Sequence, residues 1–294
     1  MPDVSLGRGY IPEDECKEQE AFPANWISPK EQLERLPSIA KEVSIIHELI
    51  PDLANIIAEY TGDSCAYYSN WYTALNRLGV RLEKIPPLPN HIRHILEGKC
   101  PIYSDQKKPD GTDYKIKDTH VLYLIPKELG TLNHFESEIL KPYGEAKYGN
   151  PNPLRFRYFW NTHRAEYGDV SFKETHWVLM SKDVLPGSRN KSWEVQAALV
   201  DALVKKAFVN YEAPSLQDAF AVMMLHKVAT EESLYQEGNE QNGNRWTYTR
   251  VQETANGHHL IVGGFAPSGV VVYDEYRRYV GDLEGRGVGA LRKF

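Results

Sequence analysis

The stretch that decides the fold is KSWEVQAALVDALVKKAFVNYEAPSLQDAFAVMML, residues 191–225. Apolar side chains recur at helical spacing on both sides of a short segment that contains Pro214, a pattern typical of two amphipathic helices. Because proline restricts the residue before it to an extended conformation, the first helix must end before Pro214. We expect helices over residues 193–206 and 216–228. The aromatic side chains expected in the core are Trp193 and Phe220.

Both helices carry terminal signals in the sequence. Ser192 stands where an N-cap hydroxyl can accept from the free N–H groups of the first turn. Ser215 and Asp218 have the spacing of a capping box, with aspartate in place of the usual glutamate or glutamine. Lys205 and Lys206 suit the negative end of the first helix dipole. These signals define a helix pair on which the later segments are expected to pack.

Composition limits the classes of function. The chain has 294 residues, of which 41% are hydrophobic and 25% charged, as is ordinary for a soluble globular protein. A net charge of −6 gives no broad attraction to phosphates, so we predict no nucleic-acid partner. The odd and widely spaced cysteines (Cys16, Cys65 and Cys100) form neither a disulfide framework nor a zinc motif, which favours a reducing compartment. With no signal core and no membrane span, the expected location is the cytoplasm, or outside it after export without a classical signal peptide.

Proline and glycine residues, together with changes of hydrophobic pattern, divide the chain into three parts. Residues 1–28 are polar and are expected to form a flexible arm, and residues 29–98 carry a series of helical patterns. Residues 99–294 then combine strand-like runs with the central helix pair, which predicts an α+β domain. Within the two later parts, further helices are expected over 70–78, 90–96 and 132–140. Strands are expected over 119–125, 155–160, 175–180, 246–251, 259–265, 270–273 and 288–292.

Five short motifs follow one another between residues 192 and 292. They are Ser192-Trp193-Glu194-Val195-Gln196-Ala197, Tyr211-Glu212-Ala213-Pro214-Ser215-Leu216-Gln217-Asp218, Gly243-Asn244-Arg245-Trp246-Thr247-Tyr248, Val262-Gly263-Gly264-Phe265 and Gly289-Ala290-Leu291-Arg292. In this order they resemble the motifs of the formylglycine-generating (sulfatase-modifying) variant of the C-type-lectin fold. The resemblance implies that residues 99–294 form a C-type-lectin-like domain. A chance similarity of another α+β domain is the alternative.

A second resemblance covers residues 88–294. The segments that carry it are HIRHILEGKCPIY, KDTHVLYLIP, HWVLMSKDVLPGSR, WTYTR and the terminal LRKF. They are similar to an uncharacterised family from bacteria that live inside amoebae. The resemblance implies a bacterial origin and a host-directed effector role, and it supplies no chemistry.

The resemblance to formylglycine-generating enzymes implies two candidate metal chemistries, one based on copper and one on iron. Those enzymes hold Cu(I) with a cysteine pair after the Gly-Gly strand, but Cys100 is the last cysteine here, which excludes that chemistry. Ergothioneine-synthase relatives of the same fold bind iron through three histidines in a helical domain. His47, His91 and His94 lie in the helical part, so a non-heme iron oxidoreductase remains an alternative. Residues 47–62 also resemble an F-box, which would make the protein an adaptor.

The function favoured by the sequence is binding without catalysis or cofactor, directed at a protein or glycan ligand. Tyrosine, tryptophan and arginine concentrate contact energy at interfaces, and alternate residues of a strand share one face. The predicted ligand-binding residues are Trp246, Tyr248, Arg250, Tyr273, Tyr276 and Arg277. In the competing interpretation, Trp246 and Tyr248 belong to the core and Arg250 pairs internally with Glu253.

Overall fold

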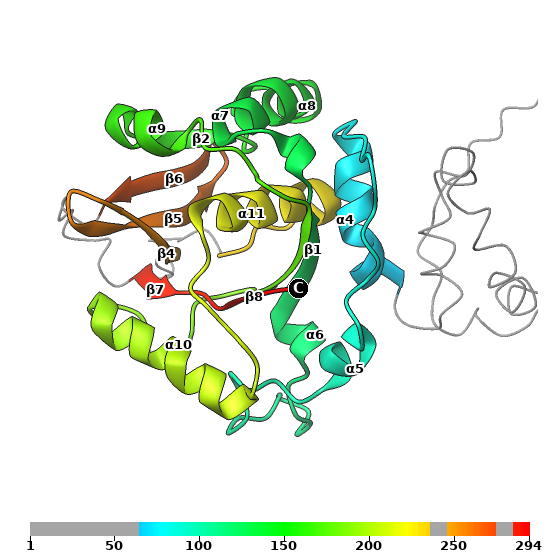
Figure 1. Cartoon of the computed structure of the whole chain (residues 1–294), viewed down its shortest axis with the longest axis vertical. Helices are drawn as coiled ribbons and strands as arrows, with labels where there is room; N and C mark the ends of the chain where they lie inside the picture. The colour runs from blue at the N-terminus through cyan, green and yellow to red at the C-terminus, as the bar shows by residue number, and fades with distance from the viewer. Residues whose placement is uncertain (1–64, 236–245, 275–284) are drawn as a thin grey trace, which may run out of the picture. The chain divides into compact units, whose positions relative to one another are not determined.

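A computed structural model describes residues 65–235, 246–274 and 285–294, which lie in one compact unit, Asp63–Phe294. Helices and two separate β-sheets build this unit, so the predicted α+β class is confirmed (Figure 1). The end of the predicted helical region, residues 65–98, is part of the same unit. The F-box-like segment 47–62 lies outside the described residues. In the described ranges, no helix is both long enough and apolar enough to span a bilayer.

Helical segments predominate along the first two-thirds of the unit, with three single strands between them. The α-helices are α4 (Cys65–Arg77), α5 (Ile92–Glu97), α6 (Ile116–Thr119), α7 (Leu132–His134), α8 (Lys141–Tyr148), α9 (Asn161–Tyr167), α10 (Trp193–Ala207) and α11 (Leu216–Thr230). A 3₁₀ turn, η2 (Lys127–Leu129), precedes α7, and a π-helical segment, η3 (Phe135–Leu140), joins α7 to α8.

The strands form two sheets. They are β1 (His120–Ile125), β2 (Phe156–Phe159), β3 (His176–Ser181), β4 (Tyr248–Ala255), β5 (His258–Ala266), β6 (Gly269–Asp274), β7 (Arg286–Val288) and β8 (Leu291–Lys293). One sheet has the order β1-β3-β8 and is antiparallel throughout. The other has the order β2-β6-β5-β4-β7, with the antiparallel β4-β5-β6 meander flanked by parallel edge strands. The last strand, β8, therefore returns to lie beside β3.

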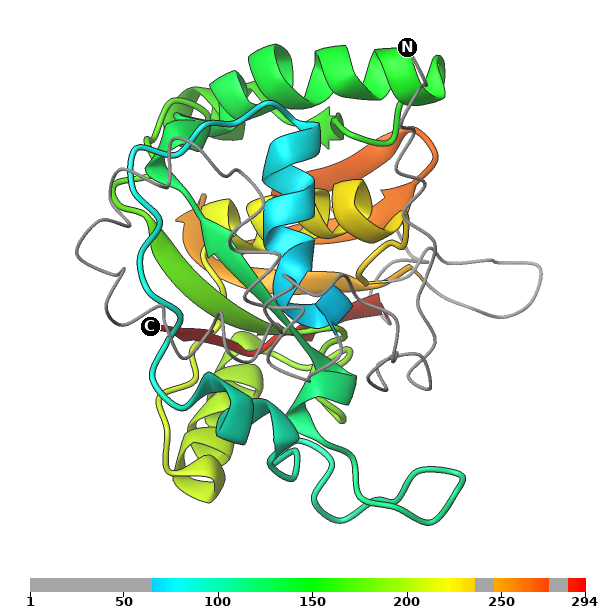
Figure 2. The ribbon, with the colours of Figure 1, turned by 90° about the vertical axis from the view of Figure 1, so that its right-hand side faces the viewer.

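Helix α11 is the core of the unit. It runs between the two sheets, and its middle is buried all round, as expected for a helix covered on every side (Figure 1). Its start is fixed locally, since Ser215 Oγ accepts from Asp218 N at 3.1 Å, as the capping-box spacing predicts. Helix α4 packs against α11 and β1 (Figure 2). Arg77 at its end donates to Val228 O at 2.7 Å near the end of α11.

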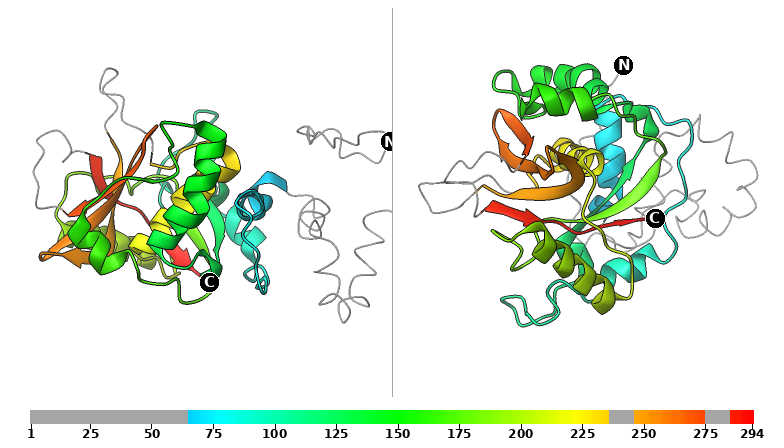
Figure 3. Two further views of the ribbon diagram at one scale, coloured as in Figure 1. Left: turned by 90° about the horizontal axis from the view of Figure 1, so that it is seen from above. Right: turned by 60° about the vertical axis from the view of Figure 1, so that its left-hand side comes forward.

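Helix α10 covers a second, smaller core. Val200 and Leu203 pack with Tyr211 and with Val288 and Ala290 of the C-terminal segment. Figure 3 shows α10 beside the β7 edge of the five-stranded sheet, with α8 and α9 at the opposite edge. Both predicted helices of the pair are present and extend one or two residues beyond the expected ends.

Several elements differ from the sequence prediction. Helix α9 is not among the expected helices, because its seven residues are mostly polar and its helical form depends on burial of His163. The strand predicted over residues 288–292 is two strands, one in each sheet, so the chain changes sheets there. Trp193 is only partly buried, because it lies at the start of α10 and stacks on His259 with 3.7 Å between ring centroids. Phe220 is fully buried, as predicted.

Candidate ligand-binding site

One aromatic cluster unites three of the predicted binding residues. Trp246 precedes β4, Tyr248 begins it, and Tyr273 lies near the end of β6. Tyr248 and Tyr273 pack with Ile261 and Val271, and the two tyrosine rings meet edge-on at 5.8 Å. The strand register causes this contact, because Tyr273 pairs with Ile261 on β5, two positions from the Gly263 that faces Tyr248. Tyr276 and Arg277 lie outside the described residues.

Two glycines of β5 make room for Tyr248. A Cβ at Gly264 would lie 2.5 Å from the Tyr248 ring, and one at Gly263 would lie 2.5 Å from the backbone oxygen of Thr247. Gly264 also has φ +56°, in the left-handed region that residues with a Cβ rarely adopt. The Gly-Gly pair noted in the sequence therefore serves close packing of an aromatic ring on the strand.

The exposed rim of the cluster comes from β2 and the residue after it. Arg157 places its guanidinium carbon 5.0 Å from the Trp246 ring centroid, within the range of a cation–π interaction. Tyr158 meets Trp160 edge-on at 5.7 Å, and 49% of Tyr158 is exposed. Arg157 is also exposed, whereas Trp160 and Trp246 are half-buried against the cluster. These four residues define what we call the aromatic rim.

Arg250 has a different position from the rest of the predicted set. It is buried on β4, and one guanidinium nitrogen donates to Lys191 O at 2.6 Å, which ties the strand to the segment before α10. The carboxylate of Glu253 accepts from Leu216 N at 2.7 Å instead. A second buried arginine, Arg286, lies with its guanidinium carbon 5.5 Å from the Tyr273 ring centroid. Tyr248 and Tyr273 therefore form the support behind the rim, whereas Arg250 supports the segment before α10.

A histidine–aspartate pair lies at one side of the cluster. His163 of α9 stacks on Trp160, and its Nε2 lies 3.4 Å from Asp274 Oδ2. Asn256, in the β4–β5 turn, donates to the same oxygen at 3.0 Å. His163 and Asp274 are both buried. The pair joins α9 to the end of β6 and so fixes Trp160 in place.

A second set of charged groups lies at the start of α11. Asp218 accepts from His176 Nε2 at 3.0 Å and from Lys293 Nζ at 2.8 Å. Burial alone would raise the pKa of Asp218, but the hydrogen bonds from His176 and Lys293 outweigh it and the pKa is lowered. Burial would lower the pKa of His176, yet its bond to Asp218 raises the value above normal.

This set does not form a catalytic triad. Ser215 Oγ donates to Asp218 Oδ2 at 2.7 Å, so the carboxylate separates the hydroxyl from the imidazole that would have to activate it. The other ring nitrogen of His176 lies 3.0 Å from Glu174 O. The groups satisfy one another and join β3, α11 and β8.

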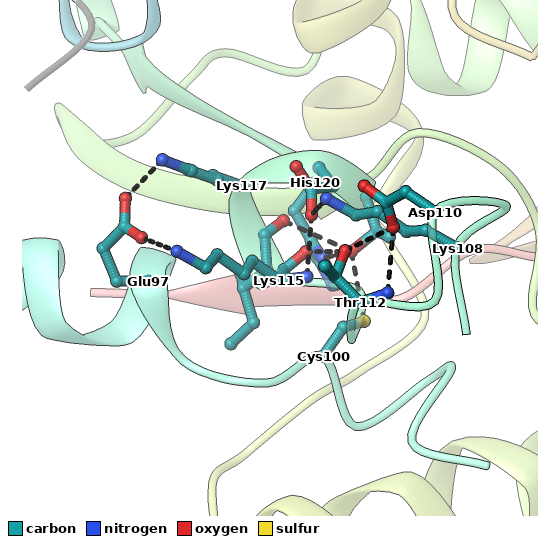
Figure 4. Close-up of polar contacts among 11 residues, drawn as sticks. Glu97, Cys100, Lys108, Asp110, Thr112, Lys115, Lys117 and His120 are labelled. Atoms are coloured by element: carbon teal, nitrogen blue, oxygen red, sulfur yellow. Dashed lines mark hydrogen bonds and ion pairs between the residues drawn. The ribbon is translucent and has the colours of Figure 1, made fainter. Parts of the chain in front are cut away.

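The third polar region surrounds the start of β1 (Figure 4). Thr119 Oγ1 lies 3.1 Å from the buried Cys100 sulfur and 2.8 Å from His120 Nδ1. Burial lowers the pKa of His120 to about 4, which keeps its ring neutral. At the surface nearby, Glu97 forms ion pairs with Lys115 and Lys117, both at 2.5 Å. The Thr119 hydroxyl, His120 Nδ1 and the Glu97 carboxylate therefore each have a partner within the fold.

The histidines proposed for iron do not share a helix face. His91 lies before α5 at φ 59°, in the left-handed region, and His94 lies within the helix; both are exposed. His47 is outside the described residues. Within the described parts of the chain, no group of three or more His, Cys, Asp or Glu side chains is arranged to hold a metal ion.

The aromatic rim is therefore the best candidate for a site. The sequence drew attention to Trp246 but not to Arg157, Tyr158 and Trp160, although all three lie in the predicted aromatic strand 155–160. Only the parallel pairing of β2 with β6, more than a hundred residues later, brings them into one cluster with Trp246. Searches against protein-family models, curated proteins and solved structures found no match for this chain.

Proposed function

We propose that the chain is a non-catalytic binding protein whose aromatic rim, formed by Arg157, Tyr158, Trp160 and Trp246, recognises a protein ligand. The observation that carries this proposal is the exposure of Tyr158 and Arg157 next to two half-buried tryptophans. Tyrosine, tryptophan and arginine are the residue types most enriched among interface residues that dominate affinity. A rigid sheet supports them, which reduces the conformational entropy lost on binding.

The C-type-lectin-like fold belongs to the same proposal. The described parts of the five motifs coincide with regular elements, at the starts of α10, α11 and β4, within β5, and around β8. The Gly263-Gly264 pair has a packing role beneath Tyr248, which gives that motif a physical reason. A host-directed effector role fits a binding protein of this kind and rests on the sequence resemblance alone.

The proposal is tested with the full chain as bait in an affinity capture. Arg157→Ala and Tyr158→Ala remove exposed side chains, so each should change stability by no more than about 0.5 kcal/mol. The matched control is Arg81→Ala, which removes an arginine from an exposed position outside the rim. We expect the two rim variants, and not the control, to weaken binding of a captured protein by roughly 30-fold or more, as for a hot spot.

Two further variants test the original prediction for the segment after β6. Tyr276→Ala and Arg277→Ala extend the same measurement to the remaining predicted residues. Unchanged binding in all four variants would remove this region from the site. If a glycan array in place of the captured protein gave binding that depended on the rim, the ligand class would be wrong while the surface would be right.

A further inference from the structure

The aromatic rim carries positive charge on a chain whose net charge is −6. Arg157 belongs to the rim, and Arg155 lies immediately before β2; both side chains are exposed. The Cα atoms of residues two apart in a chain are separated by no more than about 7 Å. One short segment of a ligand can therefore reach both arginines.

Neither arginine pairs with a carboxylate in the part of the chain that the structure describes. Arg155 donates from Nε to Ser268 O at 3.2 Å, which leaves its terminal nitrogens for other contacts. The described contact of Arg157 is its cation–π interaction with Trp246. A cation–π contact satisfies no N–H donor of the guanidinium, so these donors are available to a ligand.

Two carboxylates beside the rim already have partners within the fold. Glu136 accepts from Phe156 N, at the first residue of β2, at 2.8 Å and from Arg164 at 2.7 Å. Asp274 accepts from Asn256 Nδ2 at 3.0 Å. These acids are bound internally, and the positive charge of the two exposed arginines is left for an external partner.

Exposed arginine next to aromatic rings suits a carboxylate that is followed by an apolar side chain. A guanidinium forms paired, charge-assisted hydrogen bonds with a carboxylate, and Tyr158 and Trp160 offer ring surface for apolar packing. A nucleic-acid strand would instead need a basic groove along its backbone, and a net charge of −6 opposes a long polyanion. A short acidic segment is less affected, because charges more than about 8 Å away are screened at physiological salt.

We propose that the protein ligand of the aromatic rim presents a short acidic segment, in which an Asp or Glu carboxylate binds Arg157 and a neighbouring apolar side chain packs on Tyr158 and Trp160. Arg155 strengthens the same preference for negative charge. This inference rests on the proposed function and specifies the chemistry of its partner. Because the charges meet at the surface, added salt weakens the contact.

A peptide array probed with the full chain tests the charge of the ligand. Each randomised short sequence is synthesised in three matched forms, with Asp and Glu, with Asn and Gln at the same positions, or with Lys there. We expect the acidic form to bind best and the amide form to bind roughly tenfold or more weakly, as for loss of a hydrogen bond to a charged group. Fluorescence anisotropy at several salt concentrations then measures the affinity of the peptides that bind.

Variants of the rim separate charge recognition from the aromatic contact. Arg157→Gln should remove the difference in affinity between acidic and amide forms, and Arg155→Gln should reduce it. Tyr158→Ala should weaken both forms by the same factor and leave their ratio unchanged. Arg81→Gln, at an exposed arginine outside the rim, is the matched control and should leave affinity and ratio as in the wild type.

Equal binding of acidic and amide forms to the wild type would overturn the inference, and the proposed function would stand if Tyr158→Ala still weakened both. A preference for acidic forms that survives Arg155→Gln combined with Arg157→Gln would place the acidic contact elsewhere and also overturn it. Tighter binding of a single-stranded oligonucleotide or a phosphorylated peptide than of every acidic peptide would assign the arginines to phosphate instead. If no peptide binds, the inference is wrong, and capture of a protein by the wild type but not by Tyr158→Ala would preserve the proposed function.

Discussion

Replacing Asp218 with asparagine should destabilise the unit by removing the carboxylate that holds His176 and Lys293. Asp218 is buried, while its partners are more accessible, with 16% of the His176 side chain and 43% of the Lys293 side chain exposed. Removing one member of a buried ion pair costs about 3–5 kcal/mol. Asparagine keeps one acceptor oxygen, and Lys293 can regain water, so we expect a loss of about 2–3 kcal/mol in the free energy of unfolding.

The same substitution should change how stability depends on pH. The folded-state pKa of His176 is raised above 6.5, so its bond to Asp218 stabilises the fold below pH 6.5. This contribution is lost as the pH rises through the folded pKa. The pKa of Asp218 is lowered below 3.8, so its own contribution is present above pH 3.8 and lost in stronger acid. As the pH rises above 6.5, the wild type should lose stability and Asp218→Asn should lose less.

Urea denaturation at several pH values provides the measurement. Glu174→Gln is a suitable control, because it removes a nearby carboxylate from an exposed position. The control should follow the wild-type curve at every pH. An Asp218→Asn curve parallel to that of the wild type above pH 6.5 would refute the assignment of this slope to the His176–Asp218 bond.

Two other outcomes follow from buried groups. Burial lowers the pKa of His226 to about 4, so between pH 6.5 and 4 the unfolded chain binds more protons and stability should fall as the pH falls. His226→Gln retains a partner for Tyr123. Over this pH range it should lose less free energy of unfolding than the wild type, by up to roughly 3 kcal/mol, as measured by acid denaturation. An equal loss in both proteins would contradict the burial argument. Gly264→Ala should lower the free energy of unfolding by more than Gly257→Ala does, because both have positive φ but only the Gly264 site places a Cβ against Tyr248. Thermal denaturation compares the two, and equal losses would show that the Tyr248 contact is not the cause.

Local signals explain which elements the sequence could predict. The ends of α11 depend on Ser215, Asp218 and the preceding proline, all within a few residues, and the prediction was correct to within two residues. The short polar helix α9 has no such periodic signal, because its form depends on tertiary contacts of His163 with Trp160 and Asp274. The parallel pairing of β2 with β6 also joins residues that lie far apart in the sequence, so no local signal predicts it. The rim therefore could not be assembled from the sequence, although its residues could be seen there.

Arg250 shows the same limit of sequence-based prediction within a single strand. Alternation predicts that Tyr248 and Arg250 share one face of β4, but it does not reveal what lies next to Arg250. The structure places Lys191 O there, so the arginine supports the segment before α10. A residue type suited to binding is thus used internally at one position and exposed at another, as Arg157 is. Only burial distinguishes the two uses.

The contacts of Asp218 and His226 fit the proposed binding role. A general base must itself lie within hydrogen-bond reach of the proton that it removes from a substrate. Asp218 is occupied by His176 and Lys293, and the neutral His226 lies 3.1 Å from Tyr123 OH inside the core. The exposed Tyr158 offers its ring to solvent, where contact with a partner would remove apolar surface from water. The proposed contact surface is therefore aromatic. Asp218 and His226 instead make internal contacts that stabilise the fold.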